Sequence, residues 1–160
     1  MAIPTTNEEL LLRWYKRLRE TQMSHYNSAK PLSKLNSYLG VPVVILTTFV
    51  GTTVFTTLNK EVDVWIKVLV GMISVLAAVL SSIQTFLKYS DKAEKHRTIG
   101  AKAGNLRREI EQYIAQGDVN MIPTDKINSL RDNIDRLATD APNVPDWIWN
   151  QTIKYLDANP

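Results

Sequence analysis

The chain has 160 residues, a formal net charge of +3 and 44% hydrophobic residues, and it contains no cysteine, which excludes disulfides and thiolate metal sites. These averages describe a one-domain soluble protein, but the apolar residues are concentrated, because residues 38–58 and 68–87 carry no charge. A helix of about 20 residues rises about 30 Å, the thickness of a bilayer's hydrocarbon core, so both stretches are long enough to span a membrane. A soluble bundle that buries both stretches is the less favoured alternative.

The first predicted element is a cytoplasmic helix over residues 7–37. Asn7 is placed to cap this helix, and Leu11, Trp14 and Leu18 fall on one of its faces. Pro31 has no N–H group to donate, so we expect it to break or kink the helix.

The first membrane span is predicted at residues 38–58, which include the threonine-rich run TTFVGTTVFTT. Lipid tolerates only helices and closed barrels, and no alternating ten-residue segments recur, so we expect a helix. Each threonine hydroxyl can then bond to a carbonyl one turn earlier. Helix packing is the favoured role of these threonines and pore lining is the alternative, with Thr48 and Thr52 as candidates. Pro42 is expected to bend this span.

The second span is predicted at residues 64–87, after the five-residue turn NKEVD, so the two spans form an antiparallel hairpin with both chain ends on one side. Trp65 and Lys67 suit the membrane interface, where an indole lies among headgroups and a lysine can extend toward water. Small and hydroxyl residues share one face of this span, and we expect this face to contact protein or line a pore: Gly71, Ser74, Ala78, Ser81 and Thr85. Another face is expected to meet lipid or the first span: Leu69, Leu76, Leu80, Ile83 and Leu87.

Basic residues flank the open end of the hairpin, and the positive-inside rule therefore places both termini in the cytoplasm. Residues 1–108 carry 15 Lys and Arg against 7 Asp and Glu, whereas residues 109–160 carry 4 against 9. The basic part can contact anionic lipid, so the bilayer is an expected partner. Nucleic acid is not expected, because the basic segment lacks interleaved aromatic residues.

Three further helices are predicted after the hairpin. The first covers residues 88–116, continues the second span without interruption and ends before Gly117. Its Gly100 and Gly104 indicate either close approach of another helix or local flexibility. Two more helices, at residues 124–138 and 146–157, follow, and the second carries aromatic side chains that suit partner docking or capping of the stalk: Trp147, Trp149 and Tyr155.

If both hairpin helices continue straight into the cytoplasm, residues whose numbers sum to about 122 lie at the same height. This places His25 level with His96, and it predicts three opposite-charge pairs: Lys30 with Asp91, Glu20 with Lys102, and Arg13 with Glu109. Two neighbouring histidines would act as a pH switch, since both being charged would repel. Two unrelated surface histidines are the favoured interpretation.

The sequence lacks the motifs of nucleotide binding, metal coordination and acid–base catalysis, so neither enzymatic activity nor a cofactor is expected. The stretches RWYKRLRETQMSHYNSAKPLSKLNSYLG and KYSDKAEKHRTIGAKAGNLRREIEQYI, the hairpin between them and the segment APNVPDWIW resemble the SLATT family over roughly residues 10–150. These are bacterial two-transmembrane proteins associated with nucleotide-sensor and nucleotide-synthesising defence systems.

The resemblance implies a pore-forming effector in the bacterial cell membrane that stops growth or kills the cell on phage infection. Two helices cannot enclose a water path, so a homo-oligomer is expected. Because this chain has no evident nucleotide-binding domain, a separate sensor or nucleotide-synthesising protein would control it. The alternative is a non-conducting membrane anchor that recruits a soluble partner.

Overall fold

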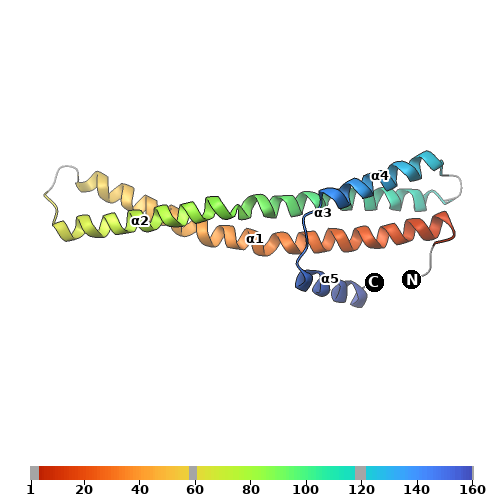
Figure 1. Cartoon of the computed structure of the whole chain (residues 1–160), viewed down its shortest axis with the longest axis horizontal. Helices are drawn as coiled ribbons and strands as arrows, with labels where there is room; N and C mark the ends of the chain where they lie inside the picture. Colours follow the sequence, from red (N-terminus) through yellow and green to blue (C-terminus); the bar gives the residue numbers. More distant parts are fainter. Residues whose placement is uncertain (1–3, 58–60, 118–121, 160) are drawn as a thin grey trace. The chain divides into compact units, whose positions relative to one another are not determined.

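The computed structural model describes residues 4–57, 61–117 and 122–159, and within them the protein is all-α, as predicted (Figure 1). The chain divides into two compact units, a bundle unit of residues 1–30 and 93–160 and a hairpin unit of residues 31–92. The helices in the described ranges are α1 (Asn7–Thr57), α2 (Val64–Leu87), α3 (Tyr89–Ala115), α4 (Thr124–Asp140) and α5 (Asp146–Ala158).

The core of the bundle unit lies between α1, α3 and α4. The face predicted for the first helix contributes Leu11, and Leu11, Ile110 and Leu130 are completely buried and come from the three different helices. Trp14, Leu106 and Ile134 pack against this cluster from the same faces. Burying a leucine or isoleucine contributes about 1.5–3 kcal/mol, so these faces hold the three helices together.

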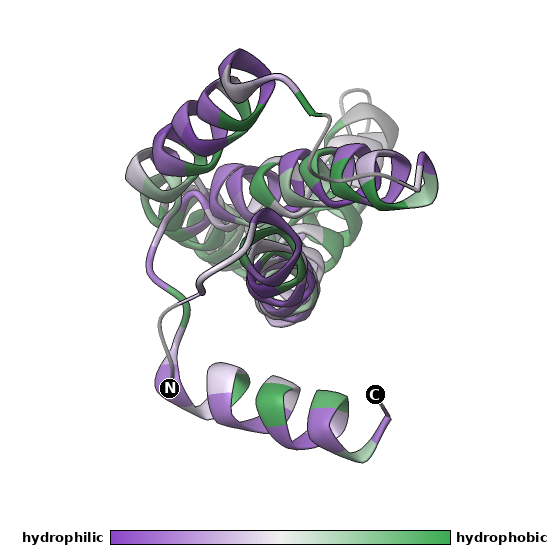
Figure 2. Cartoon of the chain, turned by 90° about the vertical axis from the view of Figure 1, so that its right-hand side faces the viewer, coloured by the Kyte–Doolittle hydropathy of each residue, from purple (hydrophilic) through white to green (hydrophobic). Residues whose placement is uncertain are grey.

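Helix α5 packs on α1 within the bundle unit. The side-chain amide of Asn27 donates to the hydroxyl of Thr152 (3.1 Å), and the guanidinium of Arg19 donates to the carbonyl of Asn159 (2.8 Å). The two helices are therefore antiparallel at this contact. Apolar and polar residues alternate along α5 in Figure 2, and its apolar residues Ile148 and Leu156 are buried.

The two glycines of α3 mark a close approach between α3 and α1. A Cβ atom on Gly100 would lie 3.3 Å from the ring of Tyr26, and one on Gly104 would lie 2.7 Å from the amide nitrogen of Gln22. Close packing, rather than local flexibility, therefore explains the two glycines.

Helix α1 differs from its prediction at two points. Its cap is Thr6 and not Asn7, because the Thr6 hydroxyl accepts from the N–H of Glu9 (3.2 Å) and the Thr6 carbonyl accepts from Leu10 (3.1 Å). The helix also continues through Pro31 and Pro42, so Pro31 does not break it. A proline inside a helix costs about 3 kcal/mol, and α1 tolerates a proline at both positions.

The prediction that the second span continues without interruption is also wrong. Lys88 adopts a left-handed conformation (φ 48°, ψ 42°) and separates α2 from α3, while its N–H still donates to the carbonyl of Gln84 (3.2 Å). Farther along, Gly117 has φ +91° and its N–H bonds to Ile114 (3.2 Å), so it follows the end of α3 as predicted. Helices α4 and α5 begin at the predicted residues and extend slightly beyond the predicted ends.

Candidate membrane-spanning site

The threonine hydroxyls between residues 47 and 53 bond to the backbone of their own helix, as predicted. Thr48 donates to the carbonyl of Val44 (2.8 Å), Thr52 to that of Thr48 (2.9 Å), and Thr47 to that of Val43 (2.8 Å). Each bond satisfies a hydroxyl donor without a second helix, and this removes most of the cost of placing a threonine in lipid. Both candidates, Thr48 and Thr52, are exposed within the single chain.

One face of α2 packs against the α1 part of the hairpin unit. Ala77 is buried at its centre, and Gln84 fixes one end, since its amide donates to Asn36 (3.4 Å) and lies 2.9 Å from where a Cβ on Gly40 would stand. Half-buried residues at three- and four-residue spacing complete this face: Val70, Ile73, Ser74, Leu80 and Leu87.

The face predicted to contact protein or line a pore lies mostly outside this helix contact. Gly71, Ala78, Ser81 and Thr85 are exposed, whereas Ser74 is half-buried. Two of its hydroxyls bond to the helix backbone, Ser74 to Val70 (2.8 Å) and Thr85 to Ser81 (2.9 Å). The neighbouring Ser82, which the prediction did not include, is also exposed and donates to the carbonyl of Ala78 (2.8 Å).

The leucine-rich face of α2 divides between two environments. Leu69, Leu76 and Ile83 are exposed, whereas Leu80 and Leu87 are half-buried against the hairpin. The chain itself therefore covers only part of this face, and the alternatives of lipid and of the first span as its neighbours stay predictions.

The apolar side chains of the hairpin are largely uncovered by the chain itself. The most hydropathic window in α1 is 0% buried and that of α2 is 6% buried, and both helices are long and apolar enough to cross a membrane. Large side chains are exposed along both spans, and Phe86 is 84% exposed. A soluble bundle would bury these residues, so the exposure favours lipid as their surroundings.

Trp65 and Lys67 lie in the first turn of α2 and both are exposed. The first residues of the turn, Asn59 and Lys60, and the last predicted residue of the first span lie outside the described residues. The role of Trp65 and Lys67 as interface anchors stays a prediction.

The three aromatic residues proposed for docking all lie at the surface of α5. Trp147 is 62% exposed, Trp149 38% and Tyr155 56%. A groove of about 420 Å³ runs between α5 and α1, and its lining includes Trp147, Tyr155 and Lys30.

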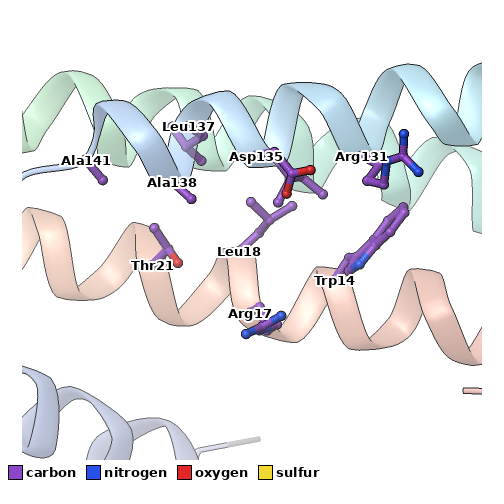
Figure 3. A pocket seen from close by; sticks show the side chains of 10 residues that line it. Trp14, Arg17, Leu18, Thr21, Arg131, Asp135, Leu137, Ala138 and Ala141 are labelled. Atoms are coloured by element: carbon purple, nitrogen blue, oxygen red, sulfur yellow. The ribbon is translucent and has the colours of Figure 1, made fainter. Parts of the chain in front are cut away.

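A second groove, of about 370 Å³, lies between α1 and α4 in the bundle unit. Figure 3 shows Trp14 and Leu18 of α1 pointing toward α4, with Arg131 near one end of the groove. Its floor is the apolar contact that holds α4 to α1.

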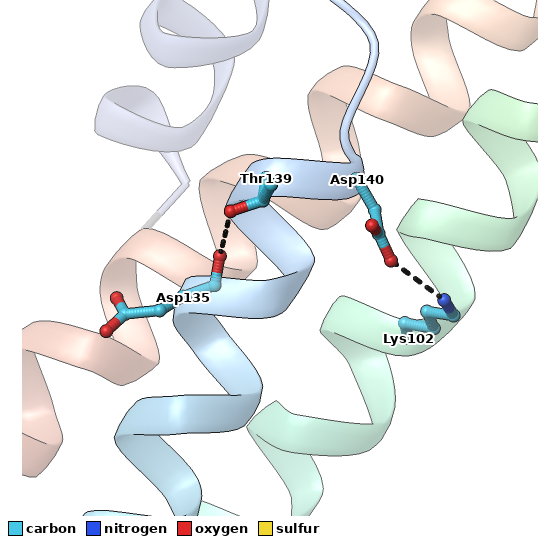
Figure 4. Close-up of polar contacts among 4 residues, drawn as sticks. All are labelled: Lys102, Asp135, Thr139 and Asp140. Atoms are coloured by element: carbon cyan, nitrogen blue, oxygen red, sulfur yellow. Dashed lines mark hydrogen bonds and ion pairs between the residues drawn. The ribbon is translucent and has the colours of Figure 1, made fainter.

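The Glu20–Lys102 pair predicted for the stalk does not form within the bundle unit. Lys102 contacts Asp140 of α4 (3.6 Å; Figure 4), while Glu20 contacts Lys16 of its own helix (4.0 Å). Figure 4 also shows the Thr139 hydroxyl donating to the carbonyl of Asp135 (2.9 Å), which secures the last turn of α4. The predicted Glu20–Lys102 pair is wrong because α4, which the two-helix stalk did not include, supplies the carboxylate.

The two histidines are neighbours, and the favoured interpretation of two unrelated surface residues is wrong. Their Nδ1 atoms lie 3.0 Å apart, and His25 and His96 are 3% and 6% exposed. The height predicted for them from the hairpin register is confirmed. Among the residues that the structure describes, no group of three or more His, Cys, Asp or Glu could hold a metal ion.

A family model matches most of the chain. The model of family 4 of the SMODS and SLOG-associating 2TM effector domains matches residues 8–143. Comparisons with curated proteins and with solved structures found no match.

Proposed function

We propose that this chain, which belongs to the SLATT family of two-transmembrane effector domains, permeabilises the bacterial cell membrane as a homo-oligomer during antiviral defence. The family identifies a defence-associated membrane effector, and the pore is our extension of that role. The observation that carries it is the exposed face of α2 with Gly71, Ala78, Ser81 and Thr85.

The physical argument begins with what this face offers a second copy of the chain. Glycine, alanine and serine let helix backbones approach closely, and close packing drives helix association in lipid, where the hydrophobic effect is absent. Hydroxyls whose protons bond to the backbone still have lone pairs for water. The same face can therefore pack between copies or line a water path, and a ring of copies would place it inside.

Orientation and control follow from charge and from the absent motifs. We infer that both termini are cytoplasmic, since the basic residues flank the open end of the hairpin. The sequence has no nucleotide-binding motif, so a separate sensor or nucleotide-synthesising protein would supply the signal. The exposed Trp147, Trp149 and Tyr155 on α5 are the surface that we assign to that partner.

The test is dye release from vesicles that contain the full chain, with the membrane potential of expressing cells as a second measurement. Ser81→Leu places a bulky apolar side chain on the small face, and Leu76→Ala is the matched change on the lipid-facing side of the same helix. We expect Ser81→Leu to reduce release at least tenfold and Leu76→Ala to leave it within twofold. Equal effects of the two variants would contradict the assignment of the face.

The second candidate function is a non-conducting anchor that recruits a soluble partner. The aromatic residues beside the groove between α5 and α1 favour it, because exposed tryptophans are common at protein interfaces. Wild-type chain that inserts into vesicles but releases no dye, with the membrane potential of expressing cells intact, would favour the anchor.

A further inference from the structure

The only two histidines of the chain meet inside the bundle unit. His25 belongs to α1 and His96 to α3, their Nδ1 atoms are 3.0 Å apart, and their ring centroids are 5.0 Å apart with the planes tilted by 42°. The residues are 71 positions apart in the chain, so this contact ties the two helices together.

The surroundings of the pair are small and mostly apolar. Ala29 of α1 and Ala93 of α3 are each 2% exposed. The serines beside the pair on α1 are also buried, but their hydroxyls bond to their own helix, Ser28 to Ser24 (2.8 Å) and Ser24 to Thr21 (3.0 Å). Each imidazole therefore has the other as its hydrogen-bond partner at Nδ1.

Charged groups on the elements around the pair are engaged elsewhere or exposed. Glu20 contacts Lys16 and Lys30 donates to Asn27 on α1, and Glu94 contacts Arg97 on α3. The remaining charges on the neighbouring segments point to solvent or to other partners: Asp91, Lys92 and Lys95 on α3, Asp140 on α4, and Asp146, Lys154 and Asp157 on α5. The titration of the pair is thus governed by burial and by the two rings themselves.

The hydrogen bond between the rings depends on their protonation. In the neutral pair one Nδ1–H donates to the bare Nδ1 of the other ring. A first proton added at an Nε2 leaves this bond intact and strengthens it with charge. A second proton must take the remaining Nδ1 lone pair, so the bond is lost and two cations face each other at 3.0 Å.

The pKa values follow from the burial. Burial first, and the charge of His96 second, lower the pKa of His25 from 6.5 to about 4, and burial lowers that of His96. When the helices separate, both rings return toward the ordinary pKa and bind protons more tightly. The free energy of the separated state therefore falls relative to that of the closed state as pH drops from 6.5 toward 4. Above pH 6.5 both rings are neutral in both states, and the closed state keeps its full stability.

We propose that His25 and His96 form a proton-binding latch, which holds α1 to α3 when neutral and releases them when both rings are protonated. Release exposes the surfaces of α1 and α3 that meet around His25 and His96. This exposure switches the chain toward permeabilisation. The switch toward permeabilisation rests on the proposed function, whereas the latch itself does not.

The latch is tested by the rate at which a thiol reagent labels a buried position in the full chain in vesicles. The protein has no cysteine, so Ser28→Cys places a single near-isosteric thiol beside the pair at a position that is 2% exposed. Ser129→Cys on the exposed side of α4 corrects for the reactivity of the thiol at each pH. The control background is His25→Gln with His96→Gln, because two amides can bond across the helices but cannot take up protons.

We expect the corrected labelling rate of Ser28→Cys to rise about tenfold or more per pH unit between 5.5 and 4.5, since the open state binds at least about one proton more than the closed state there. The glutamine background should show a flat profile over the same range. A flat profile in the histidine protein, or an equal rise in both backgrounds, would overturn the latch.

Dye release measured on the same vesicles separates the two proposals. Release that rises on acidification with the histidines and not with the glutamines supports proton control. If the labelling rate rises on acidification while dye release, still reduced by Ser81→Leu, does not change with pH, proton control is wrong and the proposed pore is unaffected. Absence of release at every pH contradicts the proposed function, while the labelling profile still decides the latch.

Discussion

Two adjacent leucines in α1 provide a sharp test of the bundle unit. Leu11 is completely buried in the core, whereas Leu12 is 48% exposed on the other side of the helix. Leu11→Ala removes the equivalent of three buried methylene groups, about 2.4 kcal/mol at 0.8 kcal/mol each, and the cavity it leaves raises the cost to about 3 kcal/mol. Leu12→Ala removes the same atoms from a largely solvated site, so we expect a cost of about 0.5 kcal/mol.

The measurement is amide hydrogen exchange of the full chain in a bilayer, followed by mass spectrometry of peptides from α1, α3 and α4. A loss of about 3 kcal/mol lowers the protection of these peptides about 150-fold, because 1.4 kcal/mol corresponds to a factor of ten. Leu12→Ala should change protection by about threefold or less. Similar losses in the two variants would refute the assignment of Leu11 to the core between the three helices.

Two further predictions concern backbone positions that the sequence did not reveal. Thr6→Ala should lower the exchange protection of the first turn of α1 about fivefold, which corresponds to a cost of about 1 kcal/mol. Asn7→Ala should leave this protection unchanged. A larger loss of protection in Asn7→Ala than in Thr6→Ala would show that Asn7 is the cap. Lys88→Gly should raise the midpoint of thermal unfolding of the full chain, because glycine relieves about 1 kcal/mol of backbone strain in the left-handed conformation. Lys88→Ala keeps the Cβ atom and should not raise the midpoint. A lower midpoint in Lys88→Gly would contradict backbone strain at this position.

Side-chain periodicity predicted the apolar face of α1 because a helix needs one continuous stripe to bury. Leu11 and Leu18 follow that stripe, and both lie in the core with Ile99 and Ile110 of α3. Gly100 could be associated with close approach from its spacing with Gly104, although spacing alone left flexibility open. These features depend on neighbouring residues within one helix, and a sequence displays such neighbours directly.

The features that were missed depend on the rest of the fold. The partner of Lys102 is Asp140, and no local pattern reveals that α4 brings this carboxylate beside α3. The left-handed conformation at position 88 has no sequence signal, because the residue is a lysine and not the glycine or asparagine that usually adopts it. The burial of His25 could not be read from its own helix either, because α3 must approach closely enough to cover it.

The hydroxyl groups on the membrane helices explain why sequence alone leaves packing and pore lining open. Thr85 and Ser82 of α2 each donate to a carbonyl one turn earlier, so neither needs water or another helix to satisfy its proton. Their polarity therefore does not force a pore, and it adds little cost if they face lipid or protein. What distinguishes their face is small size, since Gly71 and Ala78 lie on it and large residues lie on the opposite side. For this reason a leucine at position 81 is the informative change, because it removes close approach and narrows any water path at the same position.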